Sequence, residues 1–162
     1  MSDRPLIRVD NLIKPFPAGG DWFSQMFDKR TIRAVDGVSF TIGRGETLGL
    51  VGESGSGKTT VGRMIARLVE PSAGVVIYNG EDLRTTTPRR MRILRRFIQM
   101  VFQDPSSSLN RRKTVGQIVS EPLQVHRLVN RSNREDRIAE ILGLAGLSRR
   151  FVNRYPHELS GG

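Results

Sequence analysis

The stretch Gly52-Glu53-Ser54-Gly55-Ser56-Gly57-Lys58-Thr59-Thr60 decides the fold of this chain. It matches the pattern G-x-x-x-x-G-K-[ST], follows the apolar run at 47–51 and precedes a segment whose apolar residues have helical spacing. This strand–loop–helix context is the one in which the pattern forms a phosphate-binding loop. The sequence therefore predicts a nucleotide site in an α/β domain, rather than a glycine-rich turn that binds nothing.

The residues of this phosphate loop have separate expected roles. Its three glycines can take backbone angles that a Cβ would forbid, so successive N–H groups can point at a phosphate, next to the positive end of the following helix. We expect Lys58 to reach the β- and γ-phosphates, Thr59 to ligate Mg²⁺ and Thr60 to contact the α-phosphate. The remaining residues expected to bind the nucleotide are Gly52, Glu53, Ser54, Gly55, Ser56 and Gly57.

The composition fits one globular domain without membrane spans. The chain has 162 residues, of which 37% are hydrophobic and 26% charged. No run approaches the roughly 18 consecutive apolar residues of a transmembrane helix, and the amino terminus lacks the layout of a secretory signal. Cysteine is absent, which excludes disulfides and thiolate metal sites and suits a cytoplasmic protein.

The formal net charge of +10 raises the question of an acidic partner. The densest basic cluster lies on a predicted helix that begins at Thr87 and Pro88, and comprises Arg89, Arg90, Arg92, Arg95 and Arg96. The simplest interpretation is a solvated helix face. Apposition to a membrane surface or to an acidic partner is the alternative. Nucleic-acid binding is the weaker option, because aromatic residues do not interleave with the basic ones.

The spacing of apolar residues changes from strand-like to helical near Asp104. Before it, strands are expected at 6–13, within 31–42 around a turn at Asp36-Gly37, and at 47–51, 74–78 and 98–102, with a turn at Asn79-Gly80. A helix from Thr59 is expected to carry apolar residues on one face as far as Leu68. After it, two capping boxes beginning at Thr114 and Ser132 predict helices. We therefore expect a strand-rich core over 1–104 and a helical subdomain over 105–162.

Two further motifs narrow the class of nucleotide-binding protein. The stretch FQDPSSSLN occupies 102–110, and YPHELSGG ends the sequence at 155–162. Together with VGESGSGK at 51–58, these motifs resemble the ATP-binding subunits of ABC transporters, and most closely those that energise import of dipeptides, oligopeptides or nickel. The resemblance runs from about residue 5 to the last residue. It implies an α/β fold with a P-loop NTPase core of the ABC type, amino-terminal antiparallel strands and a helical subdomain.

The resemblance also implies cofactors, partners and roles. ATP and Mg²⁺ would be bound, with Lys58 and Gln103 in the catalytic machinery and Gln103 as a second group facing Mg²⁺. Ser160, Gly161 and Gly162 would contact ATP held by a second ATP-binding subunit in a head-to-tail dimer. Membrane permease subunits would hold this dimer at the cytoplasmic face of the inner membrane, as a peripheral protein, and no nucleic acid is expected. Phe16 would stack on adenine, a role for which Trp22 and Phe23 compete.

The sequence departs from the family pattern at its carboxyl end. ABC ATPases continue past the signature motif into a strand that ends in Asp-Glu, followed by a histidine, and neither is present. We therefore expect the chain to be an amino-terminal fragment with a C-terminally incomplete fold, and to hydrolyse ATP poorly by itself. A compact P-loop kinase that uses Asp104 to support Mg²⁺ is disfavoured, because Pro105 follows at once. A non-catalytic, basic nucleic-acid-binding or regulatory module remains the alternative, and a steep salt dependence of nucleic-acid affinity would favour it.

Overall fold

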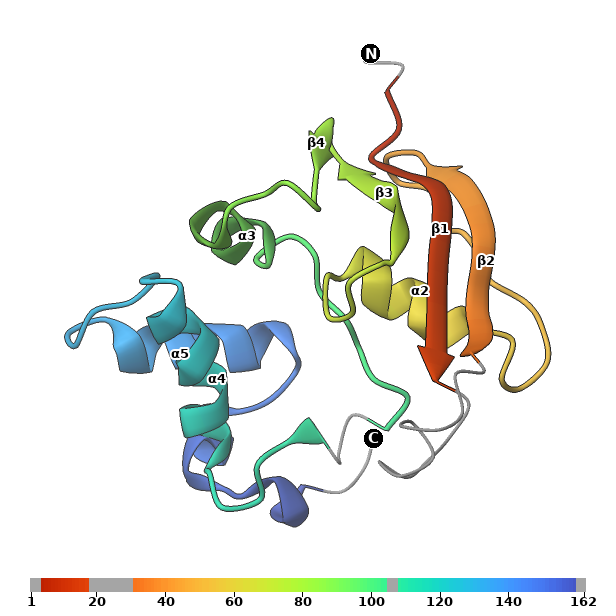
Figure 1. The fold of residues 1–162 in the computed structure, drawn as a ribbon. Helices are drawn as coiled ribbons and strands as arrows, with labels where there is room; N and C mark the ends of the chain where they lie inside the picture. The colour runs from red at the N-terminus through yellow and green to blue at the C-terminus, as the bar shows by residue number, and fades with distance from the viewer. Residues whose placement is uncertain (1–3, 18–30, 105–107, 160–162) are drawn as a thin grey trace. The chain divides into compact units, whose positions relative to one another are not determined.

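The computed structural model of the chain describes residues 4–17, 31–104 and 108–159. It divides into two compact units, Met1–Ile98 and Gln99–Gly162, coloured red to green and green to blue in Figure 1. The change from strand-rich to helical patterning expected near residue 104 therefore lies just inside the second unit.

The first unit contains an antiparallel sheet of four strands in the order β2-β1-β3-β4. These strands are β1 (Ile7–Pro17), β2 (Thr31–Ile42), β3 (Ala73–Tyr78) and β4 (Glu81–Asp82). Three of the expected strands and the antiparallel amino-terminal section are thus confirmed. The expected turn at Asp36-Gly37 is instead a bulge, since β1 skips Gly37 in its pairing and β2 continues through it.

The turn between β3 and β4 follows directly from its two residues. Asn79 and Gly80 have φ angles of 51° and 86°, as a type I′ hairpin turn requires, and glycine and asparagine reach that region at the lowest cost. The expected turn is therefore confirmed, and it returns the chain along the edge of the sheet.

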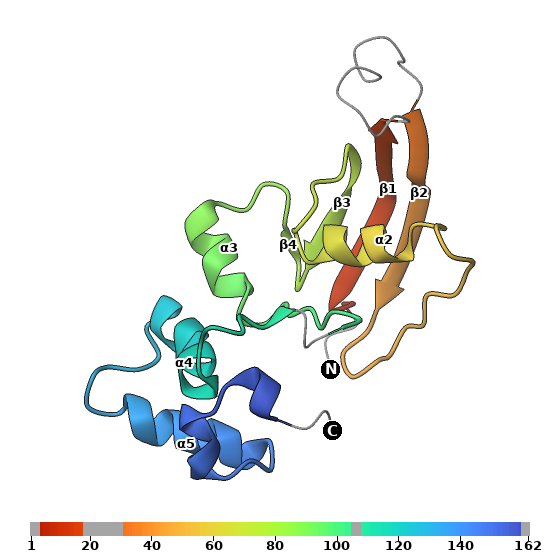
Figure 2. The same ribbon diagram turned by 90° about the horizontal axis from the view of Figure 1, so that it is seen from below.

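Helix α2 (Lys58–Ile65) lies across one face of the sheet, as Figure 2 shows. Its Val61 and Met64 are buried among strand side chains, and helix α3 (Pro88–Leu94) adds Leu94 to the same core. The buried core of this unit consists of Val9, Leu12, Val35, Val61, Met64, Val76, Leu83 and Leu94. Leu68 lies beyond the end of α2 and is 52% exposed, so the expectation that it shares one helix face with Val61 and Met64 is wrong.

Two expected strands are absent from the described structure. Residues 47–51 and 98–102 have no strand assignment, and Val51 is 99% exposed. The apolar pattern of both segments suits a strand, but a strand forms only where a neighbour accepts and donates the backbone hydrogen bonds. None of the described strands pairs with either segment.

The second unit is helical. Its helices α4 (Val115–Val125) and α5 (Arg134–Leu144) are followed by 3-10 turns at Arg149–Asn153 and Pro156–Glu158. The buried core consists of Val115, Leu123, Ile138 and Leu142. Among the described residues, no helix has both the length and the apolar character needed to cross a bilayer.

One of the two expected capping boxes is confirmed. The Thr114 hydroxyl accepts from the Gln117 N–H at 3.3 Å, and the Gln117 side chain accepts from the Thr114 N–H at 2.9 Å. The box expected at Ser132 is wrong, because the Ser132 hydroxyl instead donates to Asn130 Oδ1 at 2.7 Å. A reciprocal pair of asparagines, Asn130 and Asn133, closes the turn before α5.

Replacing Gly116 by alanine is expected to lower the free energy of unfolding by about 2 kcal/mol, because overpacking forces neighbouring atoms apart. The added Cβ would lie 2.6 Å from Val152 Cγ1 and 2.9 Å from the Val152 carbonyl oxygen. The matched change Gly143→Ala meets nothing within 4 Å on α5 and should stabilise by about 0.5 kcal/mol. Urea unfolding followed by circular dichroism measures both values. Equal losses in the two variants would contradict the close approach of Gly116 to Val152.

Candidate functional site

The phosphate loop leads directly into α2. Gly57 is the residue before the helix, with a φ angle of 89°, and no side chain caps the helix. The first turn closes through the bond from the Val61 N–H to the Gly57 carbonyl at 2.9 Å. The earlier N–H groups of α2 are therefore not used by a capping side chain and can bind an anion.

The Lys58 side chain folds back over the loop. Its Nζ donates to the Gly52 carbonyl at 2.8 Å, to the Glu53 carbonyl at 2.6 Å and to Ser56 Oγ at 3.1 Å. An ammonium group has three N–H donors, and three loop oxygens accept from it here. Lys58 is thus oriented by the loop that is expected to hold the phosphates.

Gly57 packs against the sheet. A Cβ at this position would overlap the backbone oxygen of Ala34 on β2 and would lie 3.4 Å from Val35 Cγ2. Only glycine combines this close approach with a positive φ angle. The contact joins the end of the phosphate loop to the second strand of the sheet, which the sequence pattern alone does not predict.

The first turn of α2 carries two threonines. Thr59 is exposed and Thr60 is half-buried, and neither hydroxyl has a hydrogen-bond partner in the described part of the chain. No cluster of three or more His, Cys, Asp or Glu side chains that could hold a metal occurs there either. The donor set therefore fits Mg²⁺ held through one hydroxyl and the oxygens of a bound nucleotide, and does not fit a metal site made of protein alone.

Phe16 lies on the strand next to this contact. It pairs with Ile32 of β2, two positions before Ala34, and its side chain is 39% exposed. The Lys14 ammonium lies 5.7 Å from the centre of its ring. Strand register therefore brings an accessible aromatic to the part of the sheet that the phosphate loop contacts. Trp22 and Phe23, its competitors for adenine stacking, lie outside the described residues.

The other expected site residues belong to the second unit. Gln103 is exposed, in a segment without regular secondary structure. The signature residues Ser160, Gly161 and Gly162 lie outside the described residues. The structure therefore brings together the phosphate loop, Lys58, Thr59 and Thr60, and leaves the roles of Gln103 and of the signature as predictions.

A hydrogen-bonded cluster precedes the signature, and sequence reasoning missed it. Glu158 accepts from the Tyr155 N–H at 2.7 Å and from the Arg154 guanidinium at 2.7 Å. The Arg154 carbonyl in turn accepts from the Val115 N–H at 2.8 Å, at the start of α4. The available signal was the glutamate three residues after Tyr155, with Pro156 between them. This cluster ties the segment before the signature to α4.

Glu158 should make the stability of the protein depend on acid. The Tyr155 N–H, followed by the side chain of Arg154, holds the pKa of Glu158 below its ordinary value of 4.5. A lowered pKa in the folded state stabilises the fold above pH 4.5 and loses that contribution as the pH falls through the folded-state value. In Glu158→Gln, the free energy of unfolding should therefore fall less steeply than in wild type as the pH drops below 4.5. Glu140→Gln removes the same charge and is the control; thermal unfolding at a series of pH values compares them. Identical profiles for Glu158→Gln and wild type would contradict the assignment.

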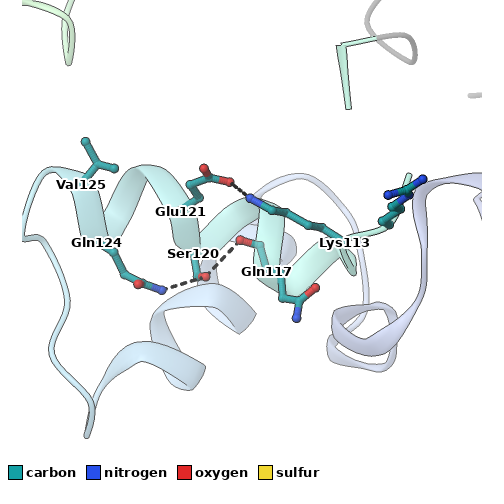
Figure 3. A pocket seen from close by; sticks show the side chains of 7 residues that line it. Lys113, Gln117, Ser120, Glu121, Gln124 and Val125 are labelled. Atoms are coloured by element: carbon teal, nitrogen blue, oxygen red, sulfur yellow. Dashed lines mark hydrogen bonds and ion pairs between the residues drawn. The ribbon is translucent and has the colours of Figure 1, made fainter. Parts of the chain in front are cut away.

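A polar pocket of about 530 Å³ lies along α4 and was not expected from the sequence (Figure 3). Its lining residues are Arg112, Lys113, Gln117, Ser120, Glu121, Gln124 and Val125. Lys113 pairs with Glu121 at 2.6 Å, and the Gln124 side chain donates to Ser120 Oγ at 3.1 Å. These groups largely satisfy one another, and no nucleophile paired with a base is among them. The pocket is a feature of the second unit and contains none of the predicted nucleotide-binding residues.

A glycine-rich loop with an oriented lysine before an uncapped helix defines the class of phosphate-loop proteins. Within that class, residues 35–162 match the family described as ABC transporter, and the chain belongs to that family. The expected α/β fold and the sequence-based resemblance are thereby confirmed.

Two relatives with curated names are ATP-binding proteins of transport systems. The chain is 46% identical over 158 residues to the glutathione import ATP-binding protein GsiA of Escherichia coli (strain K12), a match that covers 98% of this chain and 25% of that protein. It is 43% identical over 162 residues to the probable peptide ABC transporter ATP-binding protein y4tS of Sinorhizobium fredii (strain NBRC 101917 / NGR234), covering 100% of this chain and 45% of that protein. The chain thus spans less than half the length of these relatives.

Solved structures agree on the fold. The dimeric structure of a post-hydrolysis state of the ATP-binding cassette MJ0796, bound to ADP and Pi, matches with a TM-score of 0.73 and 27% identity, over 95% of this chain and 63% of that one. The structure of cbiO1 from Clostridium perfringens, part of the ABC transporter complex cbiONQ, matches with a TM-score of 0.70 over 98% of this chain and 57% of that one. At 23% identity, the second likeness supports the fold alone.

Proposed function

We propose that this chain forms the nucleotide-binding part of an ABC transporter subunit, which couples ATP binding and hydrolysis to import of peptides or a related solute. The observation that carries the proposal is the Lys58 ammonium, held over the phosphate loop by Gly52, Glu53 and Ser56 at the uncapped start of α2. The names of the relatives, one a glutathione importer and one a probable peptide transporter, support the class of solute.

The residues of the loop would bind a triphosphate by charge and by backbone donors. Lys58 brings a full positive charge, and the first N–H groups of α2 add the positive end of the helix dipole. To reach a phosphate, Lys58 exchanges one or more of its bonds with loop oxygens for charge-assisted bonds with phosphate oxygens, which are the stronger kind.

Thr59 and Gln103 are the residues that we assign to Mg²⁺, and Phe16 is the residue that we assign to the adenine ring. Bound Mg²⁺ would neutralise charge on the phosphate oxygens. The exposed Thr59 hydroxyl offers one ligand at the start of α2, and the uncharged amide oxygen of Gln103 offers another. Electrostatic stabilisation by Lys58 and the loop amides would then supply most of the catalytic effect.

Partners and location follow from the family and remain part of the proposal. A second ATP-binding subunit would receive Ser160, Gly161 and Gly162 at its own nucleotide. Membrane permease subunits would hold the dimer on the cytoplasmic side of the inner membrane and select the solute. The dimeric state of the MJ0796 cassette supports this assembly.

Titration calorimetry with ATP, ADP and AMP tests nucleotide binding. We expect ATP to bind at least about tenfold more tightly than AMP, because Lys58 and the loop engage the β- and γ-phosphates through charge-assisted bonds. Mg²⁺ should strengthen ATP binding and leave AMP binding unchanged. Equal affinities for ATP and AMP would overturn the assignment of the loop.

Transport is tested in cells that carry the gene. Deletion of the gene should abolish uptake of labelled dipeptides, oligopeptides or glutathione, and the subunit should co-purify with a membrane permease. Undiminished uptake of all three solutes would reject the proposed import function while leaving the nucleotide site untouched.

A further inference from the structure

Helix α3 presents a mixed basic and apolar surface to solvent. We define the α3 surface as the five exposed residues Arg89, Arg92, Ile93, Arg96 and Phe97. Two of them are large apolar side chains, with Ile93 42% exposed and Phe97 64% exposed. Large apolar side chains are seldom left together in water beside a row of cations, so this surface calls for a physical explanation.

Helical geometry gathers these five residues on one side. The other four lie three, four, seven and eight positions after Arg89, and helical spacings of this kind place side chains on the same face. The helical turn continues beyond α3, because the Arg96 N–H donates to the Ile93 carbonyl at 3.1 Å and the Phe97 N–H to the Leu94 carbonyl at 2.8 Å. Helix α3 and the hydrogen-bonded turn that follows it therefore carry the surface together.

The opposite face anchors the helix. Leu94 is 3% exposed, and Met91 and Ile98 pack against the same core. The Thr87 side chain caps the first turn by accepting from the Arg90 N–H at 3.3 Å. Because the core holds one face, the α3 surface keeps its orientation toward solvent.

The α3 surface has a marked excess of positive charge. No Asp or Glu occurs between Asp82 and Asp104 in the sequence. Arg90 is paired with Glu81 at 2.9 Å, whereas no ion pair within the described ranges involves Arg89, Arg92 or Arg96. Three guanidinium groups are thus available to phosphate groups of a partner.

The combination of groups favours one kind of partner. Arginine binds phosphate groups through several donors, and Phe and Ile gain free energy on entering the boundary between headgroups and acyl chains. The Arg96 guanidinium lies 5.9 Å from the centre of the Phe97 ring, so charge and apolar surface adjoin. A nucleic acid would match the charge, but it offers no apolar layer for Ile93. We propose that the α3 surface contacts the anionic headgroups of a lipid bilayer.

This contact goes beyond the proposed function and does not depend on it. Attachment through permease subunits alone leaves the subunit without a direct lipid contact, whereas the α3 surface adds one. Three arginines and two apolar side chains give a modest affinity, suited to orienting a subunit that is held by other partners.

Sedimentation with protein-free vesicles tests the contact. The protein should sediment with vesicles of equal parts phosphatidylcholine and phosphatidylglycerol, less at high salt, and should remain in solution with phosphatidylcholine alone. Changing Arg89, Arg92 and Arg96 together to glutamine should weaken binding about a hundredfold. Phe97→Ser should weaken it about fivefold, through loss of apolar contact.

A matched triple variant controls for net charge. Changing Arg111, Arg131 and Arg134, three exposed residues of the second unit, to glutamine removes the same charge and should leave binding within about threefold. Circular dichroism and ATP titration should show both triple variants folded and binding nucleotide like wild type. The ATP titration tests the proposed function and the vesicle sedimentation tests the lipid contact, so failure of one can be told from failure of the other.

Three outcomes would overturn the proposal. The first is equal binding to neutral and anionic vesicles. The second is an equal loss in the two triple variants, which would reduce the effect to net charge. The third is binding to native membranes without binding to protein-free vesicles, which would identify a membrane protein as the partner of the α3 surface.

Discussion

Lys58→Ala should weaken ATP binding by about a hundredfold, the largest effect expected of any single side chain in this protein. The variant loses a full positive charge that is positioned at the start of α2. It also loses the bonds that Lys58 Nζ makes with the Gly52 and Glu53 carbonyls and with Ser56 Oγ. Titration calorimetry with ATP measures the effect on affinity.

Amide hydrogen exchange distinguishes loss of charge from loss of loop order. If the loop depends on Lys58, amide hydrogen exchange in the free variant should speed up at Glu53 and Ser56 and stay unchanged in α4. Lys113→Ala is the matched control, because it removes a partly exposed lysine whose partner is Glu121. An unaltered ATP affinity in Lys58→Ala, or an equal loss in Lys113→Ala, would reject the nucleotide site.

Gly57→Ala should destabilise the first unit by about 3 kcal/mol and should also impair ATP binding. Two causes add: the residue has a φ angle of 89°, and the new Cβ would overlap the Ala34 backbone oxygen. Relief of the overlap requires the first turn of α2 to move away from β2. Urea unfolding and ATP titration measure the two consequences.

Gly45→Ala separates these two causes. Gly45 has a φ angle of 73° and nothing within 4 Å of an added Cβ, so its replacement should cost about 1 kcal/mol from backbone strain alone. The difference between the variants reports the contact between the phosphate loop and β2. Equal losses at both positions would show that Gly57 makes no close approach to Ala34.

Elements specified by neighbouring residues were predictable from the sequence. The Asn79-Gly80 turn, the Thr87 cap with Pro88 and the Thr114 capping box all occur where their residues predict them. Each depends on hydrogen bonds or backbone angles within about four residues. The capping box expected at Ser132 is absent for an equally local reason, because Asn130, only two positions away, accepts the hydrogen bond of the Ser132 hydroxyl.

Elements that need distant partners were less predictable. The apolar pattern of the segments at 47–51 and 98–102 predicts strands, yet no described strand pairs with them. The bulge at Gly37 likewise depends on the register between β1 and β2, which the pattern of β2 does not contain. Pairing and register are properties of two segments together.

The features of the candidate site also divide into those that a local motif predicts and those that only the folded chain shows. The phosphate loop, Lys58 and Thr59 were predictable, because a contiguous pattern of glycines before a helix specifies them. The bonds of Lys58 with loop oxygens, the packing of Gly57 on Ala34 and the cluster around Glu158 appear only in the folded chain. No motif encodes the first two contacts, whereas the third has a local signal in the glutamate three residues after Tyr155.

By itself, the sequence determined that the chain carries a phosphate loop and belongs to the ABC transporter family, since both follow from residues adjacent in the chain. The tertiary structure decided where the loop meets the sheet, that Phe16 lies near that contact and that, among the described residues, Arg89, Arg92 and Arg96 form no ion pair. The physical reason is that such contacts join segments far apart in sequence. Ala34 and Gly57 lie 23 positions apart and are neighbours in the folded unit, whose core buries Val35 and Met64 from the same two segments.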